Sequence, residues 1–500
     1  MNAPHPTEVH RIDPKDRVPL GQKSAYAMGV VSDHYAQFAI NAFLMPFFNI
    51  VLKLPPTWIG TAMGIARLWD AINDPAVGSL SDHTKSRFGR RRPYLFVGAI
   101  LTGIVFPLIW LVPRDWSDQA MMAWLVVALL LFYTCYSILS VPYESLGMEL
   151  TPDYQERTNL FTFRTYLMKL FDLGITWLMP LATTLASWLA ADQLLGTGLI
   201  IDTEPYDEQL DLLTEQNLLR TIPWVAIGVG VTIIATGILP AIFCVERYAH
   251  IAQKQRGENP VRSLLSLLMN RPFVVVMGGT SLYLLGIMSN SVLGFYVHTY
   301  YIYDADLAQG AILGGYHGTV SLVFSFVGAF IVQLVSGRID KKPLLLICVL
   351  LMLGSAVLMS VTYLPGRPYL TLATRPIQSI AETGFWILVI SMRADVGDWD
   401  EYVNGRRREG MIAALGNWMV KLAITLSAII GGVLLQYLVG FDAELAGDQN
   451  PGTLDRLKWT YVVVQASCIA TVFGVLTLYP LSRGKLSDVR AELEQRREAV

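Results

Sequence analysis

Charged side chains are scarce in this sequence of 500 residues. Asp, Glu, Lys and Arg make up 16% of it and hydrophobic residues 53%, whereas a soluble chain carries about 25% charged residues. Cysteines are few as well, and Cys135, Cys244, Cys348 and Cys468 all fall in apolar stretches, where they are expected to act as small hydrophobes. The composition excludes an ordinary soluble domain and a disulfide framework, and it predicts a membrane protein.

A strong net charge and the usual marks of an enzyme are also missing. The formal charge of −2 argues against nucleic acid as a partner. The chain has no soluble domain, no Ser, His and Asp constellation and no metal-spaced Cys and His, so a membrane enzyme or receptor is the disfavoured alternative and no cofactor is expected. Residues 1–24 are polar and lack a cleavable secretory signal, so the first apolar segment is expected to direct insertion.

Long apolar runs are what the chain has instead. Twelve of them come near or exceed the roughly 20 residues that cross about 30 Å of hydrocarbon. They cover residues 25–52, 57–80, 94–112, 120–147, 161–190, 221–244, 273–303, 307–336, 344–364, 369–392, 410–440 and 457–481. The predicted fold class is therefore an all-α polytopic membrane protein with twelve transmembrane helices.

The basic residues set the expected orientation. If the amino terminus is cytoplasmic, most Lys and Arg fall in the inner segments, as the positive-inside rule requires. Both termini are then cytoplasmic, and the inner membrane of a bacterium is the expected location. The outer loop 191–220 is rich in Asp and Glu and is expected to be solvated. Five basic residues lie inside predicted spans, namely Arg67, Arg164, Lys169, Arg375 and Lys421.

A repeated cluster divides the chain in two. "GSLSDHTKSRFGRRRP" follows the second span, and "VQLVSGRIDKKP" follows the eighth, six spans later. Two six-helix halves of the major facilitator kind, with a substrate site between them, explain this spacing; the positive-inside rule alone explains the charges but not the matched positions. The expected division is a cytoplasmic segment 1–24, a six-helix bundle 25–244, a cytoplasmic linker 245–272, a second bundle 273–481 and a cytoplasmic tail 482–500.

Acidic side chains inside the second span predict a cation site. In "RLWDAINDPAVG", Arg67, Asp70, Asn73 and Asp74 are spaced three and four apart and share one helix face. Carboxylates in a bilayer usually mark ion or substrate pathways, and oxygen ligands suit hard cations. Ser137 of the fourth span is a further expected ligand. The alternative is that Arg67 and Asp70 form a structural pair between helices.

Several segments resemble one transporter family. "ARLWDAINDPAVGSLSDHTKSRFGRRRPYL" is similar to the signature of the glycoside, pentoside and hexuronide cation symporters. The resemblance continues through "YSILSVPYESL", "ERTNLFTFR", "FWILVISMRADVGDWDEY" and "GNWMVKLAITLSA". It implies a major facilitator fold and cation-coupled symport of a sugar by alternating access. The coupling ion would be Na⁺, Li⁺ or H⁺, bound at Asp70 and Asp74, which would be metal ligands if the ion is sodium.

The resemblance also implies a sugar site, and the chain departs from it. Arg164, Trp386 and Lys421 match sugar-contacting positions. Two acids of the family pattern are replaced by His34 and Ser140. Glu144 stands where an indole is usual, while Asp33 and Glu382 offer replacement carboxylates. The full set of expected substrate-binding residues is Asp33, His34, Arg67, Ser140, Glu144, Arg164, Glu382, Trp386 and Lys421.

These departures leave the substrate open. Because a serine does not accept two hydroxyls as a carboxylate does, Arg164 and Lys421 are expected to be incompletely neutralised. A neutral glycoside is the first expectation, since Asp33 and Glu382 restore acceptors. An acidic glycoside such as a hexuronide is the second, because arginine pairs with a carboxylate through two hydrogen bonds. A lysolipid carrier on the same scaffold is the third.

A charged run after the tenth span predicts an inner gate. "ADVGDWDEYVNGRRREG" places Asp395 and Asp398 near Arg406. The basic cluster after the second span, Arg90, Arg91 and Arg92, is the expected partner from the other half. Exposed pairs contribute only about 0 to 1 kcal/mol each, which suits a clasp that opens in every cycle.

Overall fold

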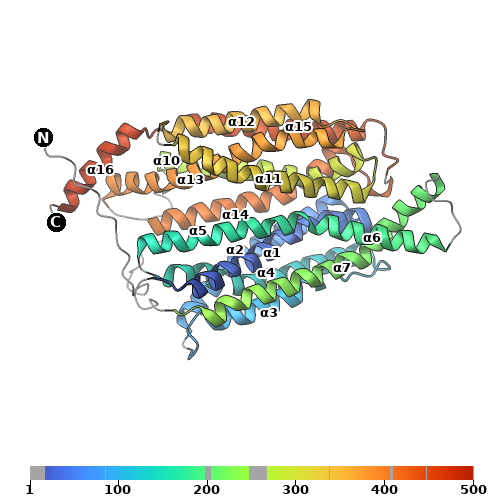
Figure 1. The fold of residues 1–500 in the computed structure, drawn as a ribbon, viewed down its shortest axis with the longest axis horizontal. Coiled ribbons are helices and arrows are strands. Elements are labelled where there is room, and N and C mark those ends of the chain that lie inside the picture. Colours follow the sequence, from blue (N-terminus) through green and yellow to red (C-terminus); the bar gives the residue numbers. More distant parts are fainter. Residues whose placement is uncertain are drawn as a thin grey trace.

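The structure is a computed structural model that describes residues 17–84, 86–151, 153–196, 204–246, 267–336, 338–405, 409–445 and 447–498. Within these ranges every regular element is helical (Figure 1). The first group of helices is α1 (Leu20–Met45), η1 (Pro46–Val51), α2 (Pro56–His83), α3 (Arg92–Leu108), α4 (Asp118–Glu149), α5 (Tyr154–Thr176), α6 (Leu178–Leu195) and α7 (Glu204–Phe243).

The second group follows residue 267. It comprises α10 (Arg271–Tyr296), η2 (Val297–Ile302), α11 (Leu307–Val335), α12 (Lys341–Thr362), η3 (Pro368–Thr374), α13 (Arg375–Asn404), α14 (Glu409–Val433), η4 (Leu434–Val439), η5 (Ala443–Leu445), α15 (Thr453–Thr477) and α16 (Arg483–Glu498). The turns η1, η2 and η4 are π-helical and continue α1, α10 and α14 without a break.

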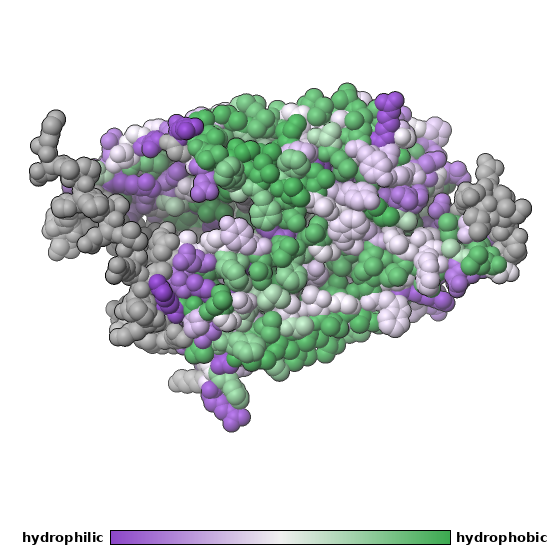
Figure 2. All heavy atoms as spheres, viewed as in Figure 1, coloured by the Kyte–Doolittle hydropathy of each residue, from purple (hydrophilic) through white to green (hydrophobic). Residues whose placement is uncertain are grey.

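Among the residues that the structure describes, eight helical rods are long and apolar enough to cross a membrane. They are α4, α5 with α6, α7, α10 with η2, α11, α12, α14 with η4, and α15. Three further helices, α1, α2 and α13, are 26, 28 and 30 residues long but carry the acidic and basic residues singled out above. On the face that Figure 2 shows, apolar residues cover much of the middle and polar residues gather toward the two ends, as expected of a chain in a bilayer.

One predicted span contains a break that the sequence did not indicate, and one sequence expectation needs correction. The fifth predicted span is divided at Trp177, whose N–H donates to Gly174 O at 3.2 Å in a tighter turn than an α-helix makes. The loop expected at 191–220 is helical from Glu204 onward. Its leucines recur at helical spacing, and Leu218 is fully buried where α7 packs on α6. The apolar face of this segment therefore outweighs its acidic character.

The helices pack in two groups with the same internal pattern. In the first group α1 packs on α7, α2 on α4, and α3 on both α4 and α7. In the second group α10 packs on α15, α11 on α13, and α12 on both α13 and α15. The groups meet through α2 with α14 and through α11 with α5 and α6 (Figure 1). The repeat read from the two basic clusters thus corresponds to a repeat in helix packing.

Candidate functional site

The two groups touch closely at the end of the molecule that carries η1, η2 and η4, here called the closed end. Gly60 of α2 lies so near α14 that a Cβ there would be 2.4 Å from the backbone oxygen of Ala428. The Thr57 N–H donates to Gln436 Oε1 at 3.1 Å, and the Tyr296 hydroxyl bonds to Asn49 Oδ1 at 2.6 Å. Close backbone approach and hydrogen bonds together join the groups at this end.

The second contact between the groups involves the break at Trp177. Its indole N–H donates to Thr319 Oγ1 on α11 at 3.0 Å. The ring lies over Gly315, where an added Cβ would approach it to 3.1 Å, and Thr176 fills the space over Gly318. The interruption between α5 and α6 therefore places an aromatic ring on a glycine stripe of α11.

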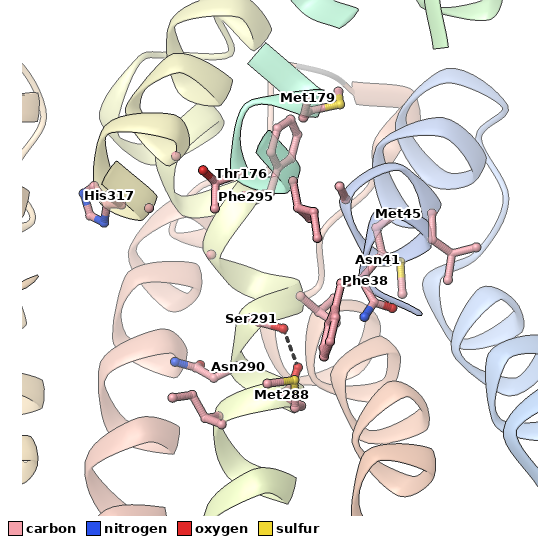
Figure 3. Close-up of a pocket in the computed structure, with 18 of the residues that line it drawn as sticks. Phe38, Asn41, Met45, Thr176, Met179, Met288, Asn290, Ser291, Phe295 and His317 are labelled. Carbon is pink, nitrogen blue, oxygen red and sulfur yellow. Dashed lines mark hydrogen bonds between the residues drawn. The ribbon is translucent and has the colours of Figure 1, made fainter. Parts of the chain in front are cut away.

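A cavity of about 540 Å³ lies between the two groups beside the closed end. Phe38 and Met45 of α1 face Phe295 and Ser291 of α10 across it (Figure 3). Such a volume, with mostly apolar walls and a few polar groups, is typical of a small-molecule site. The polar residues among its walls are Asn41, Arg67, Thr176, Asn290, Ser291, His298, His317, Ser321, Arg375, Gln378, Glu382, Ser427, Tyr461 and Gln465.

The predicted cation residues come together next to this cavity. The ammonium group of Lys421 on α14 pairs with Asp70 at 3.0 Å and with Asp74, so one lysine bridges two carboxylates of α2. Ser137 of α4 donates to Asp70 Oδ1 at 3.1 Å. Asp70 is only 2% exposed. Arg67 lines the cavity, and Asp70 follows it by one turn, so the cluster and the cavity are neighbours along α2.

Two more side chains belong to this cluster. The Arg67 guanidinium lies over the Tyr133 ring at 4.9 Å and makes a weak contact with Gln37 O at 3.5 Å. Asn73 Nδ2 and Asp74 Oδ1 are buried without a hydrogen-bond partner. A buried polar atom without a partner costs about 1 to 3 kcal/mol, so these two atoms are suited to take a ligand or water.

Arg164 does not lack a partner, which corrects the expectation that it is incompletely neutralised. Both terminal nitrogens of its guanidinium contact the carboxylate of Glu144, one of them at 3.3 Å. The guanidinium also lies over the Tyr143 ring at 5.1 Å. Lys421, with two carboxylates, likewise has more acid around it than the sequence suggested. Neither residue is therefore a free positive charge in this conformation.

The two predicted residues of α1 are bound to neighbours in the same group. Asp33 accepts a hydrogen bond of 2.9 Å from the Tyr136 hydroxyl. His34 Nδ1 lies 2.9 Å from Asp172 Oδ1 on α5. Ser140 is buried on the same face of α4 as Ser137. Sequence reasoning missed Tyr136 and Asp172, although Asp172 was visible as an acid within an apolar span.

The α13 residues divide between the cavity and a packed aromatic cluster. Glu382 lines the cavity. Trp386 instead packs edge-on against Tyr283, with ring centroids 6.3 Å apart, and against Phe385 at 5.7 Å. The structure thus places Glu382, but not Trp386, at the cavity.

Among the described residues, no ion pair of the predicted inner gate joins the two groups. Arg90 and Arg91 both pair with Glu149, Arg91 at 2.8 Å, and Arg91 also reaches Asp82 at 3.0 Å. Arg92 donates to the backbone oxygen of Ala241 at 2.6 Å. All of these partners belong to the first group of helices.

The acidic side of the gate is bound within the second group. Asp395 pairs with Lys341 at 2.5 Å and with Arg490 of α16 at 3.0 Å, and Asp398 pairs with Arg490 at 2.8 Å. The hydrogen bond that Arg490 Nε donates to the Asp398 carboxylate is the main cause that raises the pKa of Arg490 above its ordinary value. Arg406 lies outside the described residues. Each described residue of the expected clasp is therefore paired within its own group of helices.

Comparisons with known proteins give one family and a consistent set of relatives. A family model described as MFS/sugar transport protein matches residues 25–483. The isoprimeverose transporter of Lactiplantibacillus pentosus is 26% identical over 96% of this chain and 93% of its own length. The glucuronide carrier protein homolog of Escherichia coli K12 is 23% identical over 95% of both chains. A crystal structure of a bacterial homolog of the human lysosomal transporter Spinster, inward-facing and unoccupied, covers 95% of this chain and 98% of its own at 13% identity and TM-score 0.62.

Proposed function

The chain belongs to the MFS/sugar transport protein family, and on that premise we propose that it is a secondary active transporter that couples a monovalent cation to a sugar or glycoside. It is a membrane transporter and not an enzyme. The observation that carries the proposal is the cluster of Asp70, Asp74 and Lys421, which joins α2 to α14 beside the cavity. The resemblance to the glycoside, pentoside and hexuronide cation symporters agrees with these relatives.

We propose that twelve helical rods span the membrane. Beyond the eight most apolar ones these are α3, which is a shorter apolar helix, and α1, α2 and α13, each of which has polar residues in the cavity wall. Residues 25–244 and 273–481 then form the two six-helix bundles. The first described residues and α16 lie at the end opposite the closed end, and the positive-inside rule makes that end cytoplasmic. In a bacterial inner membrane this conformation is open toward the cytoplasm.

The cation site is proposed to use the oxygen atoms of Asp70, Asn73, Asp74 and Ser137. Hard cations prefer such ligands. In the present conformation the Lys421 ammonium occupies the place between the carboxylates, and a bound Na⁺, Li⁺ or proton replaces it there. The two negative charges of Asp70 and Asp74 are balanced by the two positive charges of Arg67 and Lys421. A cation that binds the carboxylates adds a third positive charge, so one of the two basic side chains is released from them. Lysine release links the cation to movement between the groups, because the ion pairs of Lys421 join α14 to α2.

The sugar is proposed to bind in the cavity and along the polar residues that lead from it. Glu382 and the unpartnered amide oxygens of Asn290 and Gln378 accept hydroxyl groups there. On the first group of helices, the proposed sugar path is lined by Asp33, His34, Ser140, Glu144 and Arg164. Coupling then requires that each ligand raise the affinity for the other, and this relation is reciprocal. The partners are thus one sugar or glycoside, one monovalent cation and the lipid bilayer.

A ligand screen on the purified protein tests this function. Thermal unfolding is followed with neutral glycosides, acidic glycosides and lysolipids in sodium, lithium and choline buffers at two pH values, since only ligands that bind the folded state raise Tm. We expect a glycoside to raise Tm, and to raise it more with the coupling cation present. Stabilisation by lysolipids alone would contradict the sugar assignment, and identical shifts in every buffer at both pH values would contradict coupling.

A further inference from the structure

Two arginines, Arg67 and Arg375, line the cavity, and among the described residues neither forms an ion pair with a carboxylate. Arg67 lies over the Tyr133 ring, one turn from Asp70 on the same helix and within range of its negative charge, whereas Arg375 has no acid one turn away. Lys421 is paired with Asp70 and Asp74, and Arg164 with Glu144. Arg375 lines the cavity from the first turn of α13, and the described residues place no carboxylate in an ion pair with it. The titratable groups that face it are the hydroxyls of Tyr363 and Tyr461, the ring of His317 and, farther along α13, the Glu382 carboxylate.

The guanidinium of Arg375 is held in place from one side. Its Nε donates to His317 Nδ1 at 2.6 Å, and His317 Nε2 lies 2.8 Å from Thr371 Oγ1, which donates to Pro368 O at 2.6 Å. A guanidinium only donates, so His317 Nδ1 accepts and the imidazole proton lies on Nε2. The neutral ring fixes Arg375 through Nε. The two terminal nitrogens, which bind carboxylates in parallel, remain without an acid.

Polar groups with unmet hydrogen bonds line the same cavity as this arginine. His298 lies beside His317 with ring centroids 4.6 Å apart, and its Nε2 atom is buried without a partner. Gln378 Oε1 and Asn290 Oδ1 are also buried without partners. All of these residues line the same cavity. An unmatched cation next to unmatched acceptors describes a site for a ligand that carries both an anion and hydroxyl donors.

Three polar residues on one face of α13 indicate how far apart the anion and the hydroxyl groups of such a ligand would lie. Arg375, Gln378 and Glu382 are three and four residues apart, so they share one face of the helix. Arg375 and Glu382 are seven residues apart, which is about 10 Å along the axis. They have opposite charges but are too far apart to neutralise each other directly. One end of this face therefore attracts a carboxylate, and the other end accepts hydroxyls.

We propose that the cavity binds a carboxylate-bearing glycoside, with Arg375 as the ligand of the carboxylate and Gln378, Glu382 and Asn290 as acceptors of its hydroxyl groups. This inference rests on the proposed function and deepens it. It moves the anion-binding role from Arg164, where the sequence placed it, to Arg375. A monoanionic sugar that moves with a monovalent cation also leaves the net charge of the loaded cavity unchanged.

Matched ligand pairs test this assignment in the full-length protein in nanodiscs. The probes are the methyl glucuronides and galacturonides in both anomeric forms, each compared with the methyl glucoside or galactoside that differs only in the carboxylate. We expect the wild-type protein to bind at least one acid more tightly than its neutral partner. Arg375→Gln should weaken that acid at least tenfold and change the neutral glycoside less than twofold, since a charged hydrogen bond is worth more than a neutral one.

Two further variants keep the test decisive. Arg164→Gln is the matched control, and we expect it to change both members of a pair by similar factors. Arg375→Lys keeps the charge and loses the bidentate geometry, so it should bind the acid with an affinity between those of wild type and Arg375→Gln; it also serves if Arg375→Gln does not fold. Equal effects of the Arg375 variants on acid and neutral ligand, or a wild type that prefers neutral glycosides, would overturn the inference and leave the symporter assignment intact. If the wild-type protein binds no glycoside in any cation buffer, both this inference and the symporter assignment are contradicted.

Discussion

At the residue scale, the protein manages its intramembrane charges by pairing most of them. The sequence correctly placed Asp70 and Asp74 on one helix face, because residues four apart on a helix are neighbours on the same face. It did not give the pairing of Arg164 with Glu144, because the rotation of α5 against α4 is set by packing and not by either helix alone. For the same reason the role of Lys421, which lies 351 residues from Asp70, required the structure.

Removing the lysine should expose its competition with the cation. In Lys421→Gln the two carboxylates face each other without the ammonium group, and like charges this close repel. We expect the variant to unfold at a lower Tm than wild type in choline and to be stabilised more than wild type by the coupling cation. Thermal unfolding in sodium, lithium and choline measures both effects. Lys485→Gln, on the exposed surface of α16, is the control, and a cation response equal to that of wild type would show that Lys421 does not occupy the site.

At the element scale, the helix boundaries depend on features that hydrophobic runs do not show. The runs located the apolar helices well, since their length is set by the bilayer. They missed the division at Trp177, because the apolar run continues through it. They also missed the early start of α7, because the apolar face that Leu218 marks is interrupted by acids. The division and the extension both place side chains at the closed end, Trp177 on α11 and Glu215 beside Lys53 at 2.7 Å.

The close approach of α2 and α14 gives a prediction about the closed end. In Gly60→Ala the new methyl group would meet the Ala428 backbone oxygen at 2.4 Å, so the two helices must separate there. We expect the variant to lose thermal stability. We also expect that a membrane-impermeant reagent added on the outer side labels a cysteine engineered into the cavity faster than in the wild-type background. Gly228→Ala on α7 has no atom within 4 Å of the new Cβ and should match wild type. Equal behaviour of the two variants would contradict the account of this contact.

The docking of α16 on α13 gives a second prediction at this scale. Arg490 joins Asp395 and Asp398, but its side chain is 53% exposed, so the pair contributes only about 0 to 1 kcal/mol. Arg490→Ala should leave Tm nearly unchanged while limited proteolysis within residues 483–498 becomes faster. Glu492→Ala, which removes the pair with Arg496 inside α16 and leaves the contact of Arg496 with Tyr402 of α13 in place, is the comparison. If the two variants are cleaved at the same rate, the contact with α13 does not hold α16.

At the scale of the whole molecule, two packed groups of helices enclose a cavity that is closed at one end and bordered by an ion-pair cluster. The basic clusters in the sequence predicted the two groups, because a repeated six-helix unit carries its cluster after the same helix and on the same side of the membrane. The sequence could not tell which end is closed, since this depends on contacts such as Tyr296 with Asn49 between distant segments. The unformed clasp between Arg90, Arg91 and Asp395 belongs to the same conformation, and its formation is expected when the closed end opens.

The most direct test of the central claim is uphill sugar uptake into proteoliposomes under an imposed sodium gradient or an imposed proton gradient. The account predicts that one of the two gradients drives accumulation of a glycoside above its external concentration. It further predicts that Asp74→Cys abolishes this accumulation while sugar binding without the cation persists, because the ion loses its ligands and the sugar does not. Asp192→Cys, an exposed acid on α6, should accumulate sugar as the wild type does. Undiminished uphill uptake by Asp74→Cys, or wild-type uptake that never exceeds the external concentration under either gradient, would contradict cation-coupled transport through this site.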